Sequence, residues 1–128
     1  MCSSDLKGIR LFQDEEHLGL ALMRGLSGDQ RAQAIIRESN LGKDQPEGRW
    51  HRADQLHFGG AFRDNRVIPY EGVAAGGFAA GAKRALLDLV GSYLSYLPAG
   101  PFAARMADAE RHLEQTHFCW IEIGRAHV

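Results

Sequence analysis

The chain has 128 residues, 45% of them hydrophobic, with 15 basic and 16 acidic side chains and a formal net charge of −1. This length and apolar content allow one compact domain or a piece of a larger one. The balanced charge gives no basic stripe, so nucleic acid is not an expected partner. No apolar run reaches the roughly 20 residues that a membrane-spanning helix needs, so no membrane-spanning segment is expected either.

Both ends of the chain match the translation of a common sequencing adapter. Residues 123–128 can be encoded by one adapter strand, and its reverse complement encodes residues 1–6 when a GTG start codon is read as Met. We therefore expect both segments to be adapter-derived, and residues 7–122 to form an incomplete single domain. Because these ends are expected to come from an adapter, they give no indication of where in the cell the protein is located. Cys119 is then the one natural cysteine, which excludes a disulfide framework.

Two helices are predicted in the first third of the chain. They follow residues 7–12, in which apolar and polar side chains alternate loosely. Acidic residues at positions 14–16 suit a helix N-terminus, and leucines follow at every fourth position from Leu18 until Gly25 ends the helix. Ser27 and Gln30 have the spacing of a capping box, and Ala32, Ile35 and Ile36 give the next helix an apolar face. These two helices are predicted to form an antiparallel hairpin.

A long loop is predicted from Leu41 to Gly77, where 37 residues include two prolines and seven glycines without regular periodicity. Structureless connections longer than about 12–15 residues are uncommon in compact domains and are usually functional loops or disorder. Disordered segments generally lack apolar area, which Trp50, Phe58 and Phe62 supply here. The pattern therefore favours an ordered loop.

The last third predicts a second helical hairpin followed by a strand. Ala79 to Leu97 has one broad apolar face, and Pro101 suits the first position of another helix that packs antiparallel to it. After Thr116 the period changes to two, with Phe118 and Trp120 on one side. We expect an orphan C-terminal strand whose partners are missing. The predicted fold class is a mainly α fragment of an α+β protein.

Two motifs carry a resemblance to a known family. The run Asp64-Asn65-Arg66, followed after two residues by Pro-Tyr-Glu-Gly at positions 69–72, and the Phe-x-Trp strand at 118–120 resemble the family called domain of unknown function 3500. The resemblance covers nearly all of residues 7–122. It implies that the protein continues past the strand into a longer portion with further histidines. The family name implies no activity.

Polar, aromatic and turn-forming residues concentrate between positions 57 and 73, which makes this stretch the best candidate for a site. The candidate catalytic residues are His57, Asp64, Arg66, Tyr70 and Glu71. Arg66 can grip a carboxylate or phosphate, and Glu71 can serve as a general base or metal ligand. The alternative is turn chemistry, in which Asp64 bonds its own backbone and Arg66 pairs with Glu71.

His117 is the candidate metal ligand. Glu114 and His117 have the Glu-x-x-His spacing of di-iron carboxylate bundles, but those sites need two such pairs and further glutamates. One pair alone favours ordinary exposed residues at a helix end. A divalent metal is therefore expected only if the complete protein supplies more ligands. Cys119 has no recognisable catalytic partners and is predicted to be a buried small hydrophobe.

The sequence leaves two hypotheses about function open. The first is a hydrolytic or metal-assisted enzyme that acts on a small molecule and whose site is completed by a missing C-terminal portion. The second is a non-catalytic binding or structural module in which the 57–73 stretch is scaffold. The sequence indicates no oligomeric state.

Overall fold

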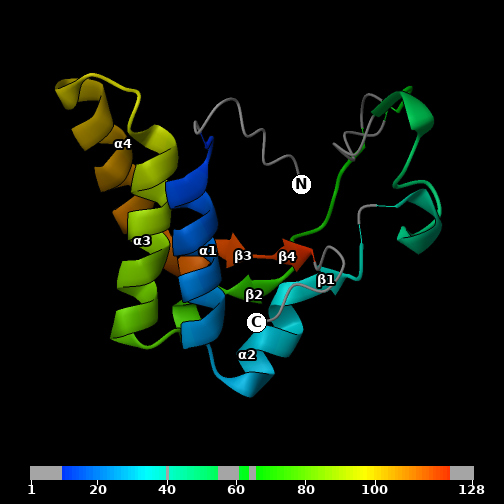
Figure 1. Cartoon of the computed structure of the whole chain (residues 1–128), viewed down its shortest axis with the longest axis horizontal. Helices are drawn as coiled ribbons and strands as arrows, with labels where there is room; N and C mark the ends of the chain where they lie inside the picture. Colours follow the sequence, from blue (N-terminus) through cyan, green and yellow to red (C-terminus); the bar gives the residue numbers. More distant parts are fainter. Residues whose placement is uncertain (1–9, 40, 55–60, 64–65, 122–128) are drawn as a thin grey trace.

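The computed structural model describes residues 10–39, 41–54, 61–63 and 66–121 (Figure 1). These residues are mainly helical, with short strands between the helices. The predicted adapter-derived segments, residues 1–6 and 123–128, lie outside the described residues, as do the candidates His57 and Asp64. The elements in chain order are α1 (Gln13–Gly25), α2 (Gly28–Ala34), β1 (Ile35–Arg37), η1 (Gly42–Asp44), η2 (Arg52–Asp54), β2 (Val73–Ala74), η3 (Ala75–Gly77), α3 (Ala80–Leu94), α4 (Ala99–Arg111), η4 (Leu113–Gln115), β3 (His117–Phe118) and β4 (Trp120–Ile121), where η marks a 3-10 helix.

Local sequence sets the boundary between α1 and α2. Three acidic residues occupy the first turn of α1, where the helix dipole favours negative charge, and the helix ends at Gly25 as predicted. The capping box is confirmed: Ser27 Oγ accepts a hydrogen bond from the Gln30 backbone N–H at 3.2 Å, and the Gln30 side chain accepts one from the Ser27 N–H at 3.2 Å. Both bonds satisfy donors that a helix N-terminus leaves free.

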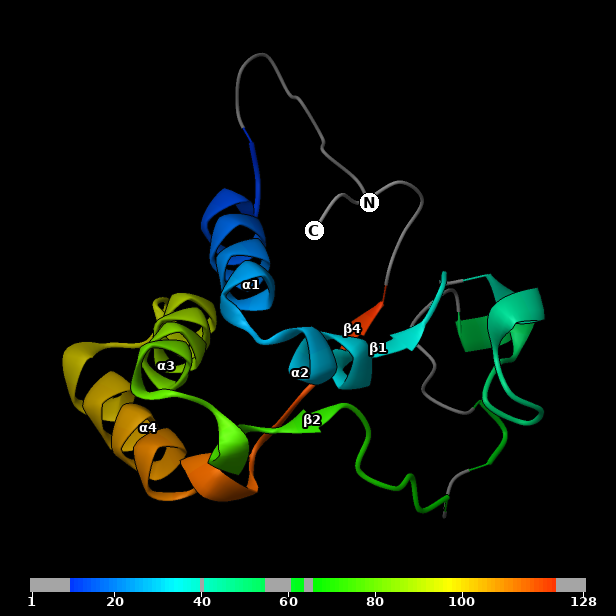
Figure 2. The ribbon, with the colours of Figure 1, turned by 90° about the horizontal axis from the view of Figure 1, so that it is seen from below.

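The prediction that the second helix continues through Ile35 and Ile36 is wrong. The helix ends at Ala34, and the two isoleucines begin strand β1, which pairs in parallel with β4. β-Branched residues are well suited to a strand, and the distant partner decides between the two structures. The first two helices do not form the expected hairpin, because α1 packs along α3 instead (Figure 2).

The prediction of an orphan C-terminal strand is also wrong, because both halves of that segment have partners. β3 pairs antiparallel with β2, with Phe118 opposite Val73, and β4 pairs with β1, with Trp120 opposite Ile35. Phe118 is buried, and buried backbone groups need hydrogen-bond partners. The segments that supply them lie far away in the sequence. One of them, β2, falls inside the region predicted to be loop.

α3 and α4 lie side by side and run in opposite directions (Figure 1). α3 ends three residues before the predicted Leu97, and α4 begins at Ala99 rather than at Pro101. Gly91 of α3 allows close packing, because a Cβ built there would lie 3.7 Å from the Met106 side chain of α4. Among the helices in the described ranges, none is both long and apolar enough to cross a membrane.

One hydrophobic core joins the helical layer to the strands. Leu22 and Met23 of α1 are its largest fully buried side chains, and they share the core with Val73 of β2 and Phe118 of β3. Leu86 of α3 completes the contact with the helices. The core therefore fixes the chain directly after Gly72, at Val73.

Candidate functional site

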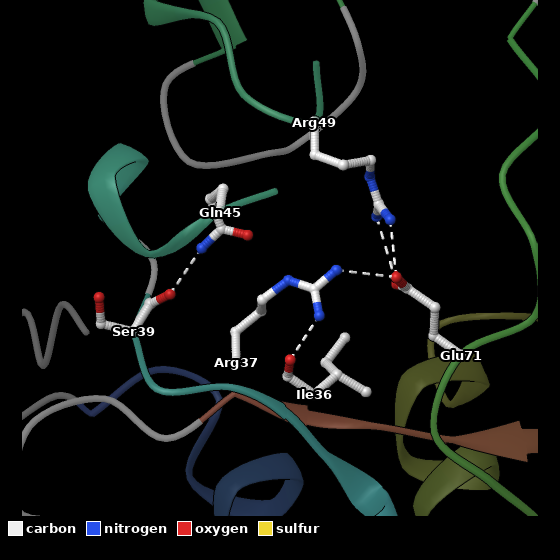
Figure 3. Close-up of polar contacts among 6 residues, drawn as sticks. All are labelled: Ile36, Arg37, Ser39, Gln45, Arg49 and Glu71. Atoms are coloured by element: carbon white, nitrogen blue, oxygen red, sulfur yellow. Dashed lines mark hydrogen bonds and ion pairs between the residues drawn. The ribbon is translucent and has the colours of Figure 1, made fainter. Parts of the chain in front are cut away.

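Glu71 lies at the centre of a network of charged side chains that joins three separate segments (Figure 3). Arg49 donates to it through both terminal nitrogens, with Nη1 2.7 Å from Oε1 and Nη2 3.2 Å from Oε2. Arg37, at the end of β1, donates from Nη2 to Oε1 at 3.0 Å. The side chains of the two arginines and the glutamate are only 17–22% exposed. The carboxylate therefore links β1, the loop around Arg49 and the segment before β2.

These contacts determine the charge state of Glu71. The hydrogen bond from Arg49 has the largest effect on the pKa of Glu71 and lowers it, whereas burial raises it. The charges of Arg49 and Arg37 lower the pKa further, and the net shift is downward from the ordinary value of 4.5. A carboxylate with a lowered pKa and both oxygens already engaged is a weak proton acceptor. This geometry favours a structural role for Glu71 over that of a general base.

Gly72 allows the Glu71 segment to lie directly against β3. Its φ angle is +86°, a left-handed conformation that favours glycine. A Cβ at this position would lie 2.2 Å from the carbonyl oxygen of Phe118 and 2.8 Å from Cβ of Cys119. Both the backbone conformation and the close approach therefore require glycine at position 72.

The structure brings two of the predicted site residues together. The rings of Tyr70 and His117 are stacked, with centroids 5.1 Å apart and planes inclined by 7°. Nδ1 of His117 lies 3.2 Å from the carbonyl oxygen of Gln115. Because a carbonyl oxygen can only accept, Nδ1 is the donor in this bond, and Nε2 of the neutral ring then carries the lone pair. No described residue is hydrogen-bonded to Nε2.

Cys119 is exposed, so the prediction of a buried small hydrophobe is wrong. It follows Phe118 in a segment where alternate side chains face away from the core. Partial burial raises the pKa of the Cys119 thiol, and the negative charge of Glu71 raises it further. Nucleophilic cysteines require a lowered pKa, so the Cys119 thiol is not activated even though the residue is exposed.

The predicted Glu-x-x-His pair does not show the contacts of a metal site. Glu114 forms an ion pair with Lys83 of α3, with Nζ 2.6 Å from Oε1. Across the described ranges, no three His, Cys, Asp or Glu side chains are grouped so that they could hold a metal ion. A metal ion bound to His117 Nε2 would therefore need its other ligands from elsewhere in the protein.

Arg66 does not contact Glu71, which differs from the pairing considered for a turn. Its Nη1 donates to the backbone carbonyl of Gly48, the residue before Arg49. Gly48 has a positive φ of +77°, and a Cβ built on it would lie 3.3 Å from Nη1 of Arg63 and 3.7 Å from Nη2 of Arg66. The guanidinium groups of Arg63 and Arg66 thus both lie beside Gly48.

The family model described as "Protein of unknown function (DUF3500)" matches residues 2–127 of the chain. The chain belongs to this family. Comparison with curated proteins and with solved structures gave no significant match.

In this DUF3500 chain the structure brings together Tyr70 and His117, places Glu71 in an ionic network, and sets Arg66 against a neighbouring loop. Sequence reasoning missed Arg37 and Arg49. Neither has a spacing relation to Glu71, which lies 34 and 22 residues away in the chain. No local signal could have identified them, because the network forms only when the strands pair.

Proposed function

We propose that the described residues form one wall of a hydrolytic or metal-assisted active site, with His117 as its base or metal ligand. The observation that supports this most directly is the orientation of the imidazole. The Gln115 carbonyl accepts a hydrogen bond from Nδ1, and the Tyr70 ring lies stacked on the imidazole. Catalytic and metal-binding histidines are commonly oriented in this way through one ring nitrogen, which leaves the other nitrogen to act.

The proposal assigns supporting roles to the neighbouring residues. Glu71, with its two arginines, stabilises the Tyr70 segment against β3. His57 and Asp64 stay candidates by their place in the same stretch of sequence. The remaining catalytic groups are proposed to come from a C-terminal portion of the protein beyond this chain. A metal-assisted reaction would also need ligands from that portion, because the described residues supply no cluster of three.

The test uses the complete gene product and two chromogenic substrates, p-nitrophenyl acetate and p-nitrophenyl phosphate. His117→Gln is expected to lower the rate of hydrolysis by roughly 10²–10⁴-fold, the range for loss of a general base. His112→Gln is the matched control, because His112 is also exposed and only its backbone is hydrogen-bonded in the described residues. Equal rates for the two variants would contradict the proposal, and absence of stoichiometric bound metal would remove its metal-assisted version.

A specific observation favours a second candidate, a non-catalytic binding or structural module. Both oxygens of Glu71, a predicted catalytic residue, are already bonded to arginine side chains. In that case the 57–73 stretch is scaffold. The complete gene sequence separates the two candidates, since the enzyme requires additional His, Asp or Glu residues and the module does not.

A further inference from the structure

Arg63 and Arg66 lie over Gly48, and Arg37 and Arg49 share the carboxylate of Glu71. We call Arg37, Arg49, Arg63 and Arg66 the arginine cluster. They come from β1, from the loop after η1 and from the segment before Tyr70. The chain as a whole has a formal net charge of −1, so this concentration of positive charge does not follow from composition. Folding brings Arg63 to Arg66 over Gly48, and Arg37 to Arg49 at Glu71.

The charges within the described part of the cluster do not balance. Glu71 is the carboxylate that engages it, and both of its oxygens are occupied by Arg49 and Arg37. Arg63 and Arg66 form no ion pair with any acidic side chain in the described ranges. The hydrogen bond from Arg66 goes to the neutral carbonyl of Gly48, so no carboxylate among the described residues is paired with its charge.

Arg63 and Arg66 are close enough to grip one anion. Nη1 of Arg63 and Nη2 of Arg66 lie 3.3 Å and 3.7 Å from the same point above Gly48, so no more than 7.0 Å separates them. Because position 48 is glycine, no side chain fills the space between them and the backbone. Two guanidinium groups at this separation repel each other, and a carboxylate or phosphate group between them would accept hydrogen bonds from both.

We propose that the arginine cluster is an anion-binding subsite that takes the carboxylate or phosphate group of a small-molecule ligand between Arg63 and Arg66, over Gly48. The subsite goes beyond the proposed function, because it requires neither catalysis nor a metal ion. Arg49 follows Gly48 directly in the chain, and Glu71 fixes the side chains of Arg49 and Arg37.

The experiment is a titration of the purified full-length protein with sodium phosphate and with sodium acetate at constant ionic strength, followed by isothermal calorimetry. Sodium chloride at the same ionic strength is the control titrant. Saturable binding of phosphate or acetate is expected. The anion that binds more tightly shows whether the ligand group is a phosphate or a carboxylate. Binding no tighter than that of chloride would overturn the proposal.

Two variants test whether the named residues hold the anion. Arg63→Gln is expected to weaken binding roughly tenfold or more, since a charge-assisted hydrogen bond contributes at least that factor. Arg63 is exposed and donates no hydrogen bond to a described residue, so this change leaves the described contacts intact. Arg105→Gln is the matched control, because it removes the same charge from an exposed position on α4, which lies away from the Gly48 loop (Figure 2). Equal affinities of the two variants would overturn the proposal.

Asp64 lies between the two arginines in sequence and outside the described residues, so the test must separate it from an external anion. If the wild-type protein binds the anion and Asp64→Asn raises its affinity only severalfold, the result supports the subsite. Binding that appears only in Asp64→Asn would mean that the chain satisfies its own arginines, and it would overturn the proposal.

Discussion

Replacing Glu71 by Gln tests whether the ionic network holds the strands and the loop together. The substitution keeps the size of the side chain but removes the charge that binds Arg49 and Arg37. Hydrogen bonds to charged groups contribute about 1.5–3 kcal/mol each, and breaking a buried ion pair costs about 3–5 kcal/mol. Because the three side chains are still 17–22% exposed, solvent screening reduces these values. We expect a loss of about 2–3 kcal/mol in the free energy of unfolding.

The assay is equilibrium unfolding in urea at neutral pH, followed by circular dichroism. Glu110→Gln is the matched control, because Glu110 is exposed on α4 and forms no ion pair with a described residue. The control is expected to change the free energy of unfolding by less than about 0.5 kcal/mol. If the two variants unfold within that margin of each other, the network does not stabilise the fold and the reasoning is refuted.

The same structure makes three further predictions. Since the folded-state pKa of Glu71 is lowered, its stabilisation is present above the unfolded-state pKa and is lost as the pH falls through the folded-state value. Urea unfolding at about pH 6.5 and about pH 3 should therefore show a larger loss of stability in wild type than in Glu71→Gln, and equal losses would contradict this. Gly72→Ala should cost about 3 kcal/mol from its positive φ and its clash with the Phe118 carbonyl. Gly81→Ala, in open space within α3, should raise the free energy of unfolding by about 0.5–1 kcal/mol. A thermal melt in which Gly72→Ala is more stable than Gly81→Ala would refute the role given to Gly72. Cys119 should react with iodoacetamide at pH 7.5 more slowly than free cysteine, because its pKa is raised, and faster alkylation would show an activated thiol.

The helices could be predicted where local sequence decides their boundaries. The Ser27–Gln30 capping box and the end of α1 at Gly25 depend on residues within one turn of each other, and both were predicted. Propensity and capping act over a few residues, so a single sequence carries enough information about them.

The strands could not be predicted, because their structure depends on partners far away in the chain. Ile35 fits the apolar face of a helix as well as it fits a strand, and pairing with Trp120 decides between them. Val73 has no local alternation, since β2 has only two residues, and it becomes a strand by pairing with Phe118. Non-local pairing overrides the local pattern in both cases.

The candidate site was predictable in its location but not in its connections. Tyr70, Glu71 and His117 were recognised as residue types that carry chemistry, and the structure places the first and third in contact. The partners of Glu71 were not foreseen, because Arg37 and Arg49 meet it only after β1 and the loop have been positioned by the sheet. Residue type identifies a candidate group, whereas its protonation and orientation come from tertiary neighbours.

Chemical rescue of a His117→Ala variant tests the central claim most directly. In the complete gene product this variant should lose hydrolysis of the chromogenic substrates, and added imidazole should restore part of the rate, because the space left beside Tyr70 can accept the free base. Glu71→Gln should show no such rescue, since both oxygens of Glu71 are bonded to arginine side chains. Full activity of His117→Ala, or its inactivity at every imidazole concentration, would contradict the assignment of His117 as the base.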